Sequence, residues 1–184
     1  MMKIGLLVRT VRHLKPRQIF YQVWRRIQRA LESHPKCADA ELPEFTFLNV
    51  TAKPKGWNDE SLDLLWRYNL HYFDWVAQGK DLDAEERRRE AAENLIGRWI
   101  RENPKGSFPG WDPYPTSLRI VNWVKWLRSE GDGEGTAKDT KSLVEVSLGE
   151  QAEWLMGHLE YHLLANHLLA NAKALVYAGK YLDR

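Results

Sequence analysis

The chain is poor in cysteine, with Cys37 as the only one in 184 residues. A disulfide within the chain is therefore excluded, and cysteine usage gives no sign of an oxidising compartment. No run approaches the roughly 18 apolar residues of a membrane-spanning helix, so we expect no membrane partner. The opening residues MMKIGLLVRTVRHLKP lack the apolar centre and cleavage site of a signal peptide. This favours a cytoplasmic protein, with the periplasm as the alternative.

An excess of charge of either sign is also missing. The formal net charge is +2 and 28% of the residues are charged, which gives no field on the scale of a polyanion-binding protein. A basic cluster lies between Arg9 and Arg29, and we interpret it as the solvated face of an amphipathic helix, with contact to an anionic partner as the alternative. Motifs that read nucleic-acid bases are absent, so no nucleic-acid partner is expected.

Strand patterns are scarce, and apolar residues at helical spacing dominate the chain. Proline-rich residues 33–58 form an irregular connecting segment in which FTFLNV is a strand or an extended stretch. Caps and breaks predict helices over Lys15–Ala30, Leu62–Gln78, Asp83–Glu102, 116–127, Lys141–Gly157 and Leu159–Leu182. We therefore predict a single all-α domain over residues 1–184, built of antiparallel helical hairpins.

The segment Glu160–Leu175, EYHLLANHLLANAKAL, places polar groups inside an otherwise apolar predicted helix. At about 100° per residue they fall on two stripes a quarter turn apart, one of His158, His162 and Asn166 and one of Glu160, Leu164, His167 and Asn171. Adjacent Asn166 and His167 would then face one groove, with an amide that grips a carboxylate and an imidazole that moves a proton. Satisfied packing residues are the alternative interpretation.

Aromatic and polar residues alternate in two further segments, Leu65–Trp75 and Trp111–Trp126. Flat rings stack on the C–H faces of sugars, while amides and guanidinium groups bind hydroxyls and carboxylates. The mixture predicts a carbohydrate groove, although core packing is the alternative for each ring taken singly. The candidate substrate-binding residues are Tyr68, Asn69, His71, Tyr72, Trp111, Tyr114, Arg119, Asn122 and His162.

A zinc site is one interpretation of three histidines, because His158, His162 and His167 follow one another at spacings of four and five. Five residues turn the third histidine about 140° away from the second on a helix. No cysteine or suitably spaced carboxylate completes a tetrahedral set. We therefore predict no metal site.

Three segments in order, WRYNLHYFDW, GWDPYPTSLRIVNWVKW and EYHLLANHLLANAKALVYAGKYL, resemble the N-terminal helical part of heparinase II/III-like polysaccharide lyases and their relatives in exopolysaccharide gene clusters. The opening LVRTVRHLKPRQIFYQVWRRI is similar to their amino-terminal helix. The resemblance covers most of the chain. It implies an incomplete α/α toroid whose partner is an acidic polysaccharide or oligosaccharide, and no cofactor is expected.

Lyases of this family cleave uronic-acid polysaccharides by β-elimination. The resemblance implies that Asn166 neutralises the uronate carboxylate and that His167 acts as the base or orients it. The family's proton-donating tyrosine and a further histidine belong to a later helix and a β-sandwich, which match nothing in this sequence. We therefore expect a chain that is inactive alone and associates through exposed helix faces. A noncatalytic carbohydrate-binding or assembly module is the alternative.

Overall fold

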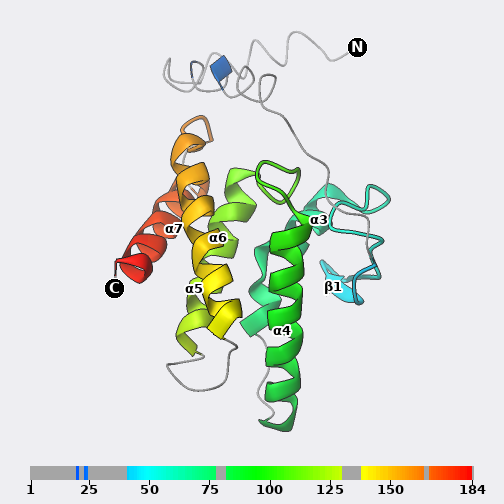
Figure 1. Ribbon diagram of the computed structural model, residues 1–184. Coiled ribbons are helices and arrows are strands. Elements are labelled where there is room, and N and C mark those ends of the chain that lie inside the picture. The colour runs from blue at the N-terminus through cyan, green and yellow to red at the C-terminus, as the bar shows by residue number, and fades with distance from the viewer. Residues whose placement is uncertain are drawn as a thin grey trace, which may run out of the picture.

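The computed structural model describes residues 20, 23, 24, 41–77, 82–129, 138–163 and 166–183. The prediction of an all-α protein is confirmed, because helices dominate this part of the chain (Figure 1). The predicted helix Lys15–Ala30 lies outside the described residues, apart from Phe20, Val23 and Trp24. The elements are β1 (Phe45–Phe47), β2 (Val50–Ala52), α3 (Leu64–Tyr72), the 3-10 helix η1 (Asp74–Ala77), α4 (Leu82–Glu102), α5 (Pro113–Ser129), α6 (Lys138–Gly157) and α7 (Asn166–Leu182).

Helix α5 lies at the centre and packs against α3, α6 and α7. Successive helices α4, α5, α6 and α7 run alternately up and down in Figure 1, as antiparallel hairpins should. Buried residues such as Ile120, Val121, Trp123 and Val124 lie on all sides of α5, as is typical of a helix covered by several neighbours. This packing agrees with the predicted hairpins, and closure into a toroid remains a proposal.

Two helix boundaries differ from the prediction for local reasons. Helix α3 is capped by Asp63, whose Oδ1 accepts from the Leu65 amide at 2.8 Å, and it ends at Phe73, which has a left-handed φ of 57°. The predicted helix to Gln78 is therefore divided into α3 and η1. Helix α5 begins at Pro113, three residues earlier than expected, since the first turn of a helix needs no amide donor.

The predicted helix Leu159–Leu182 is wrong in its first part. Helix α6 ends at Gly157, and α7 begins only at Asn166. Between them the Glu160 amide donates to the side-chain Oδ1 of Asn171 at 2.9 Å instead of to a carbonyl of its own helix. Such a side-chain acceptor competes with helical hydrogen bonding. His158 and His162 consequently do not share a helix with Asn166, and neither predicted stripe runs along one continuous helix.

Within the predicted irregular segment 33–58, FTFLNV forms a two-stranded antiparallel hairpin that pairs Phe47 with Val50. Leu48 and Asn49 at its tip have φ of 54° and 61°, as a type I′ turn requires at both central positions. Trp66 ties the hairpin to α3, because its Nε1 donates to the Val50 carbonyl at 3.0 Å. Residues 45–52 of this segment are therefore regular, whereas residues 41–44 and 53–58 lie outside helices and strands.

Tryptophan rings form much of the core. Trp57, Trp99 and Trp123 are fully buried around Phe73, and the Trp99 and Trp123 rings meet edge to face at 5.5 Å. Edge-to-face contact is a favourable geometry for aromatic pairs beyond the area that they bury. Most tryptophans of the described residues thus pack the interior, which was the alternative interpretation for each ring.

Exposed apolar residues gather on the last two helices. Val146 and Met156 on α6 are 65% and 60% exposed, and Leu169 and Val176 on α7 are 69% and 55% exposed. The predicted self-association through helix faces would bury such residues, and it remains a prediction. Among the described helices, none has both the length and the apolar character needed to cross a bilayer.

Candidate functional site

Two pockets lie beside the first turns of α7. The histidine pocket, of about 350 Å³, is lined by His162 and His167 together with Tyr68, Tyr114 and the carboxylates of Asp112 and Glu160. The lysine pocket, of about 430 Å³, is lined by Asn122, Lys125, Asn166, Lys173 and Asp74. Tyr72 lines both pockets, so they adjoin each other.

Asn166 and His167, the predicted catalytic pair, occupy the first turn of α7. Neighbouring residues on a helix point about 100° apart, and the two side chains accordingly line different pockets. Asn166 is exposed in the lysine pocket, and His167 is half-buried in the histidine pocket. The expected single groove is thus replaced by two adjoining pockets, with the amide in one and the imidazole in the other.

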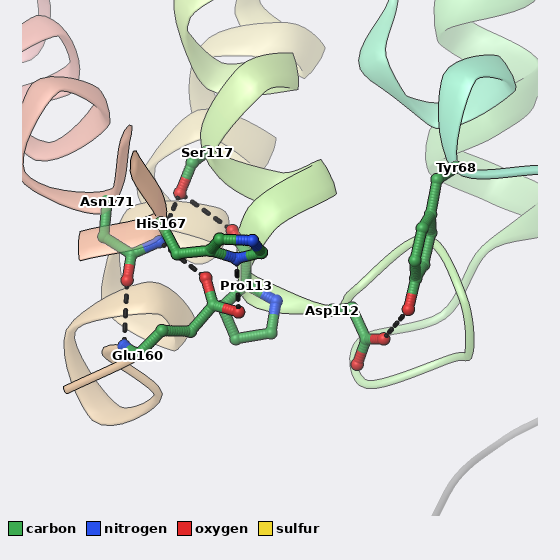
Figure 2. A network of polar contacts seen from close by, with 7 residues as sticks. All are labelled: Tyr68, Asp112, Pro113, Ser117, Glu160, His167 and Asn171. Atoms are coloured by element: carbon green, nitrogen blue, oxygen red, sulfur yellow. Dashed lines mark hydrogen bonds and ion pairs between the residues drawn. The ribbon is translucent and has the colours of Figure 1, made fainter. Parts of the chain in front are cut away.

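A polar network anchors His167 (Figure 2). Its Nδ1 lies 3.1 Å from Glu160 Oε1, and the second oxygen of Glu160 accepts from Asn171 Nδ2 at 3.1 Å. Asn171 Nδ2 also donates to Ser117 Oγ at 2.9 Å, and Ser117 in turn donates to the Pro113 carbonyl at 2.8 Å. The network therefore joins the α6–α7 connection, α7 and the start of α5.

Tyrosines form the other wall of the histidine pocket. The Tyr68 hydroxyl donates to Asp112 Oδ2 at 2.6 Å, which holds that ring in place (Figure 2). The Tyr114 ring lies over His167 with 4.3 Å between the centroids, and it meets Tyr72 edge to face at 6.0 Å. Burial, followed by nearby Tyr114 and Asp74, raises the pKa of Tyr72 to about 12. Tyr72 is therefore a neutral phenol near neutral pH.

The lysine pocket has the opposite electrostatic character. Lys125 and Lys173 line it from α5 and α7, against the single carboxylate of Asp74, and Lys173 Nζ lies 5.7 Å from the centroid of the neighbouring Tyr177 ring. Asn122 donates from Nδ2 to the Tyr72 carbonyl at 2.9 Å, which fixes the orientation of its amide. In contrast, the described residues that line the histidine pocket include two carboxylates and neither lysine nor arginine. An anionic group is favoured in the lysine pocket alone.

Two predicted binding residues are wrong because they are sealed inside the core. His71 is fully buried: its Nε2 donates to the Trp57 carbonyl at 2.9 Å, and its Nδ1 accepts from Trp99 Nε1 at 2.9 Å. Burial, followed by the charge of Arg119, lowers its pKa to about 3. Arg119 is itself fully buried, with Nη1 donating to the Gly110 carbonyl at 2.7 Å. Neither side chain reaches a ligand.

Two further predicted binding residues are also directed elsewhere. Trp111 is 4% exposed, and its Nε1 donates to the Asn103 carbonyl at 3.0 Å inside the core. Asn69 donates back to the Leu65 carbonyl of its own helix at 2.8 Å and lines neither pocket. Tyr68, Tyr72, Tyr114, Asn122 and His162 do line the pockets, as predicted.

Sequence reasoning missed several residues that complete the site. Lys125 and Lys173 belong to the lysine pocket, and Asp112 and Glu160 to the histidine pocket. Asp112 lies within the WDPYP segment, which was already singled out from the sequence. Its hydrogen bond with Tyr68 could not be predicted, because Tyr68 is distant in the sequence. His158, the third of the zinc candidates, stacks on Trp154 at 3.7 Å and lies outside both pockets. Within the described residues, no group of three or more histidine, cysteine or acidic side chains could hold a metal ion.

Comparison with known proteins adds no identification to this geometry. A scan against protein-family models, a search of curated proteins and a search of solved structures each gave no match for the chain.

Proposed function

We propose that the chain is the N-terminal helical part of a uronic-acid polysaccharide lyase, and that its two pockets hold the sugar at the cleaved bond. The observation that supports this most directly is that Asn166 and His167 line two different but adjoining pockets. The amide lines a pocket with two lysines, and the imidazole lines a neighbouring pocket of phenols and carboxylates. This is the separation of carboxylate binding from proton transfer that β-elimination needs.

The lysine pocket takes the uronate carboxylate. Lys125 and Lys173 supply positive charge. The Asn166 side chain is exposed, so its amide can donate a hydrogen bond to the bound carboxylate. Neutralising this carboxylate makes the C5 proton of the sugar more acidic, because negative charge that develops at C5 delocalises onto the carboxyl group. The carboxylates of the histidine pocket disfavour the reverse orientation.

The histidine pocket carries out the proton transfers. His167 takes the proton from C5, the C5–H electron pair forms the C4–C5 double bond, and the C4–O bond breaks. The leaving oxygen then needs a proton. By resemblance a tyrosine outside the matched segments gives it, and within this chain Tyr68, Tyr72 and Tyr114 are the phenols that share the pocket with His167.

Three further tyrosines lie away from the two pockets. Tyr181 donates to Glu145 Oε1 at 3.0 Å, and Tyr161 and Tyr177 line neither pocket. We expect the chain alone to form no unsaturated uronate, measured by ultraviolet absorbance. Measured product would place the proton donor among Tyr68, Tyr72 and Tyr114, the tyrosines of the histidine pocket.

The binding step is tested by NMR titration with uronate oligosaccharides and with neutral oligosaccharides of equal length. The side-chain amides of Asn122 and Asn166 should shift only with the acidic sugars, with millimolar affinity, or about −4 kcal/mol. Tryptophan fluorescence would report poorly, because the described residues of both pockets include no tryptophan. Equal shifts with neutral sugars would refute recognition of the carboxylate.

Matched variants locate the bound carboxylate. Lys173→Ala removes a charge from the lysine pocket, whereas Lys180→Ala removes one from an exposed site two turns further along α7 and outside both pockets. We expect Lys173→Ala to weaken binding by about three- to tenfold, as loss of one charge–charge contact would, and Lys180→Ala to leave it unchanged. Equal effects of both would point to nonspecific attraction. Binding without any product in a longer parent protein would support the noncatalytic module.

A further inference from the structure

The hydrogen bonds around Glu160 have only one consistent set of donors and acceptors. The Pro113 carbonyl accepts only, so the Ser117 hydroxyl donates its proton there. The oxygen of Ser117 is then an acceptor for Asn171 Nδ2, at 2.9 Å. The Pro113 carbonyl at the start of α5 therefore sets the direction of both hydrogen bonds, that of Ser117 and that of Asn171 on α7.

The orientation of the Asn171 amide is fixed from its other side as well. The backbone N–H of Glu160 donates only, so the atom facing it at 2.9 Å is Oδ1. Nδ2 therefore faces Ser117 and Glu160, and its second proton goes to Glu160 Oε2 at 3.1 Å. Asn171 is fully buried, so no water competes for these bonds.

Glu160 is consequently held by both its backbone and its side chain. Its carboxylate accepts only, and the remaining oxygen, Oε1, faces His167 Nδ1 at 3.1 Å. The neutral imidazole must then carry its proton on Nδ1. The Glu160 side chain is 8% exposed while that of His167 is 39% exposed, so a buried carboxylate meets a ring that is partly open to solvent.

We propose that Glu160 is a positioning residue that fixes His167 as the Nδ1–H tautomer and leaves Nε2 as the proton acceptor of the histidine pocket. Within residues 41–77, 82–129, 138–163 and 166–183, no hydrogen bond to Nε2 of His167 is found. The Tyr114 ring packs on the face of the imidazole, which restricts its rotation. Ser117 and Asn171 hold the carboxylate from behind.

The tautomer decides what His167 does in the proposed elimination, and only this part of the inference rests on the proposed function. The Nε2 lone pair takes the C5 proton, and the C5–H electron pair becomes the C4–C5 double bond as the C4–O bond breaks. The imidazolium that forms lies against the Glu160 carboxylate and is stabilised by it. Without Glu160, Nε2 would carry the proton in part of the molecules and those could not act as the base.

Long-range proton–nitrogen correlation spectra of the full chain test the inference without any activity. They are recorded about two pH units above the ordinary histidine pKa of roughly 6.5, where a free imidazole is neutral. The unsubstituted protein should show His167 with a protonated Nδ1 and an unprotonated Nε2. A major Nε2–H form would overturn the proposal.

Glu160→Gln should reverse the tautomer. Asn171 Nδ2 only donates, so the introduced amide oxygen faces Asn171 and its NH₂ group faces His167 Nδ1. Nδ1 then becomes an acceptor, and the proton moves to Nε2. Glu150→Gln makes the same chemical change at an exposed position on α6 and should leave the His167 spectrum unchanged. An Nδ1–H tautomer that persists in Glu160→Gln would show that Glu160 does not select it.

The same samples separate this inference from the proposed function. Glu160→Gln leaves the residues of the lysine pocket unchanged, so the Asn166 side-chain amide should still shift with acidic sugars while the tautomer of His167 changes. A reversed tautomer with no uronate binding to any form would uphold the positioning role and refute the lyase proposal. Uronate binding with an Nε2–H wild type would refute the positioning role alone.

Discussion

Two histidines in this protein are held in opposite tautomers by their surroundings. His71 donates from Nε2 to a carbonyl and accepts at Nδ1 from Trp99, so both of its nitrogens are occupied inside the core. His167 faces a carboxylate at Nδ1, and its side chain is 39% exposed. The first ring closes a structural network, whereas the second has one nitrogen available for a ligand.

The difference teaches how to distinguish a packing histidine from a reactive one. Both rings lie among aromatic side chains, and both residues were predicted to belong to a site, His71 to bind substrate and His167 to act in catalysis. What separates them is the count of satisfied ring nitrogens and the presence of a pocket. Four variants or conditions probe this comparison, in order of expected effect.

Arg119→Ala should have the largest effect on stability, because Arg119 belongs to a fully buried cluster with His71 and Trp99. Its guanidinium donates to Gln151 and Gly110 and lies 3.8 Å from the centroid of the Trp99 ring. Removing it leaves buried acceptors without a donor and opens a cavity, which should lower the free energy of unfolding by roughly 3–5 kcal/mol. Urea denaturation measures this. Arg128→Ala, at an exposed position on the same helix, should change it by no more than about 0.5 kcal/mol.

Acidification should weaken the fold through His71. Its folded pKa of about 3 lies below the ordinary histidine value of 6.5, so below pH 6.5 the unfolded chain binds a proton that the folded chain does not. Stability is therefore unaffected above that pH and falls as the pH drops toward 3, by roughly 1.4 kcal/mol per pH unit or about 2 kcal/mol at pH 5.

Urea midpoints at pH 7 and pH 5 measure this loss of stability. The acidic groups with lowered pKa values, such as Asp59 and Glu102, act in the same direction but only at lower pH, since the ordinary pKa values of these groups are 3.8 and 4.5. His71→Gln removes the titrating group and should flatten the profile between pH 7 and pH 5. An unchanged slope in that variant would assign the effect to another residue.

Gly110→Ala tests how tightly the His71 ring is enclosed. An added Cβ would lie 2.7 Å from His71 Nδ1 and 3.2 Å from the Trp99 ring, and neither buried ring has room to move. Overpacking of this kind should cost about 1–3 kcal/mol in urea denaturation. Gly179→Ala on α7 meets nothing within 4 Å and should instead stabilise the protein by about 0.5–1 kcal/mol. A neutral Gly110→Ala would mean that the cluster adapts.

Asn166→Ala should have the smallest effect on stability. The side chain is exposed in the lysine pocket, so the free energy of unfolding should stay within about 0.5 kcal/mol of the unsubstituted protein. Asn171→Ala is the matched comparison on the same helix. It removes three buried hydrogen bonds and should cost roughly 1–3 kcal/mol. A large loss from Asn166→Ala would return that residue to a structural role.

Much of the helical layout follows from local patterns. The spacing of apolar residues predicted α4 and α6 to within three residues of their observed ends. The failure at α7 has a tertiary cause, because the Asn171 side chain, eleven residues away, takes the amide of Glu160. An acceptor at that distance leaves no periodic signal in the sequence.

The candidate site was predictable in part for the same reason. The pockets are lined by several of the predicted residues, namely the three tyrosines, Asn122, Asn166 and His167. His71 and Arg119 have equally suitable side chains but are buried in the core. Residue type and spacing do not tell which side of a helix will be covered. The lysines of the pocket were missed because each reads as an ordinary solvated residue on its own helix.

The sequence by itself determined the helical class, the hairpin order and the adjacency of an amide and an imidazole, because these depend on residues close together in the chain. Only the tertiary structure decided which polar groups are sealed and which line a pocket, since burial depends on neighbours from other helices. Only it placed Glu160 beside His167 and Lys125 beside Lys173. The surroundings of the His167 imidazole and the positive charge of the lysine pocket arise from those contacts, which no single segment contains.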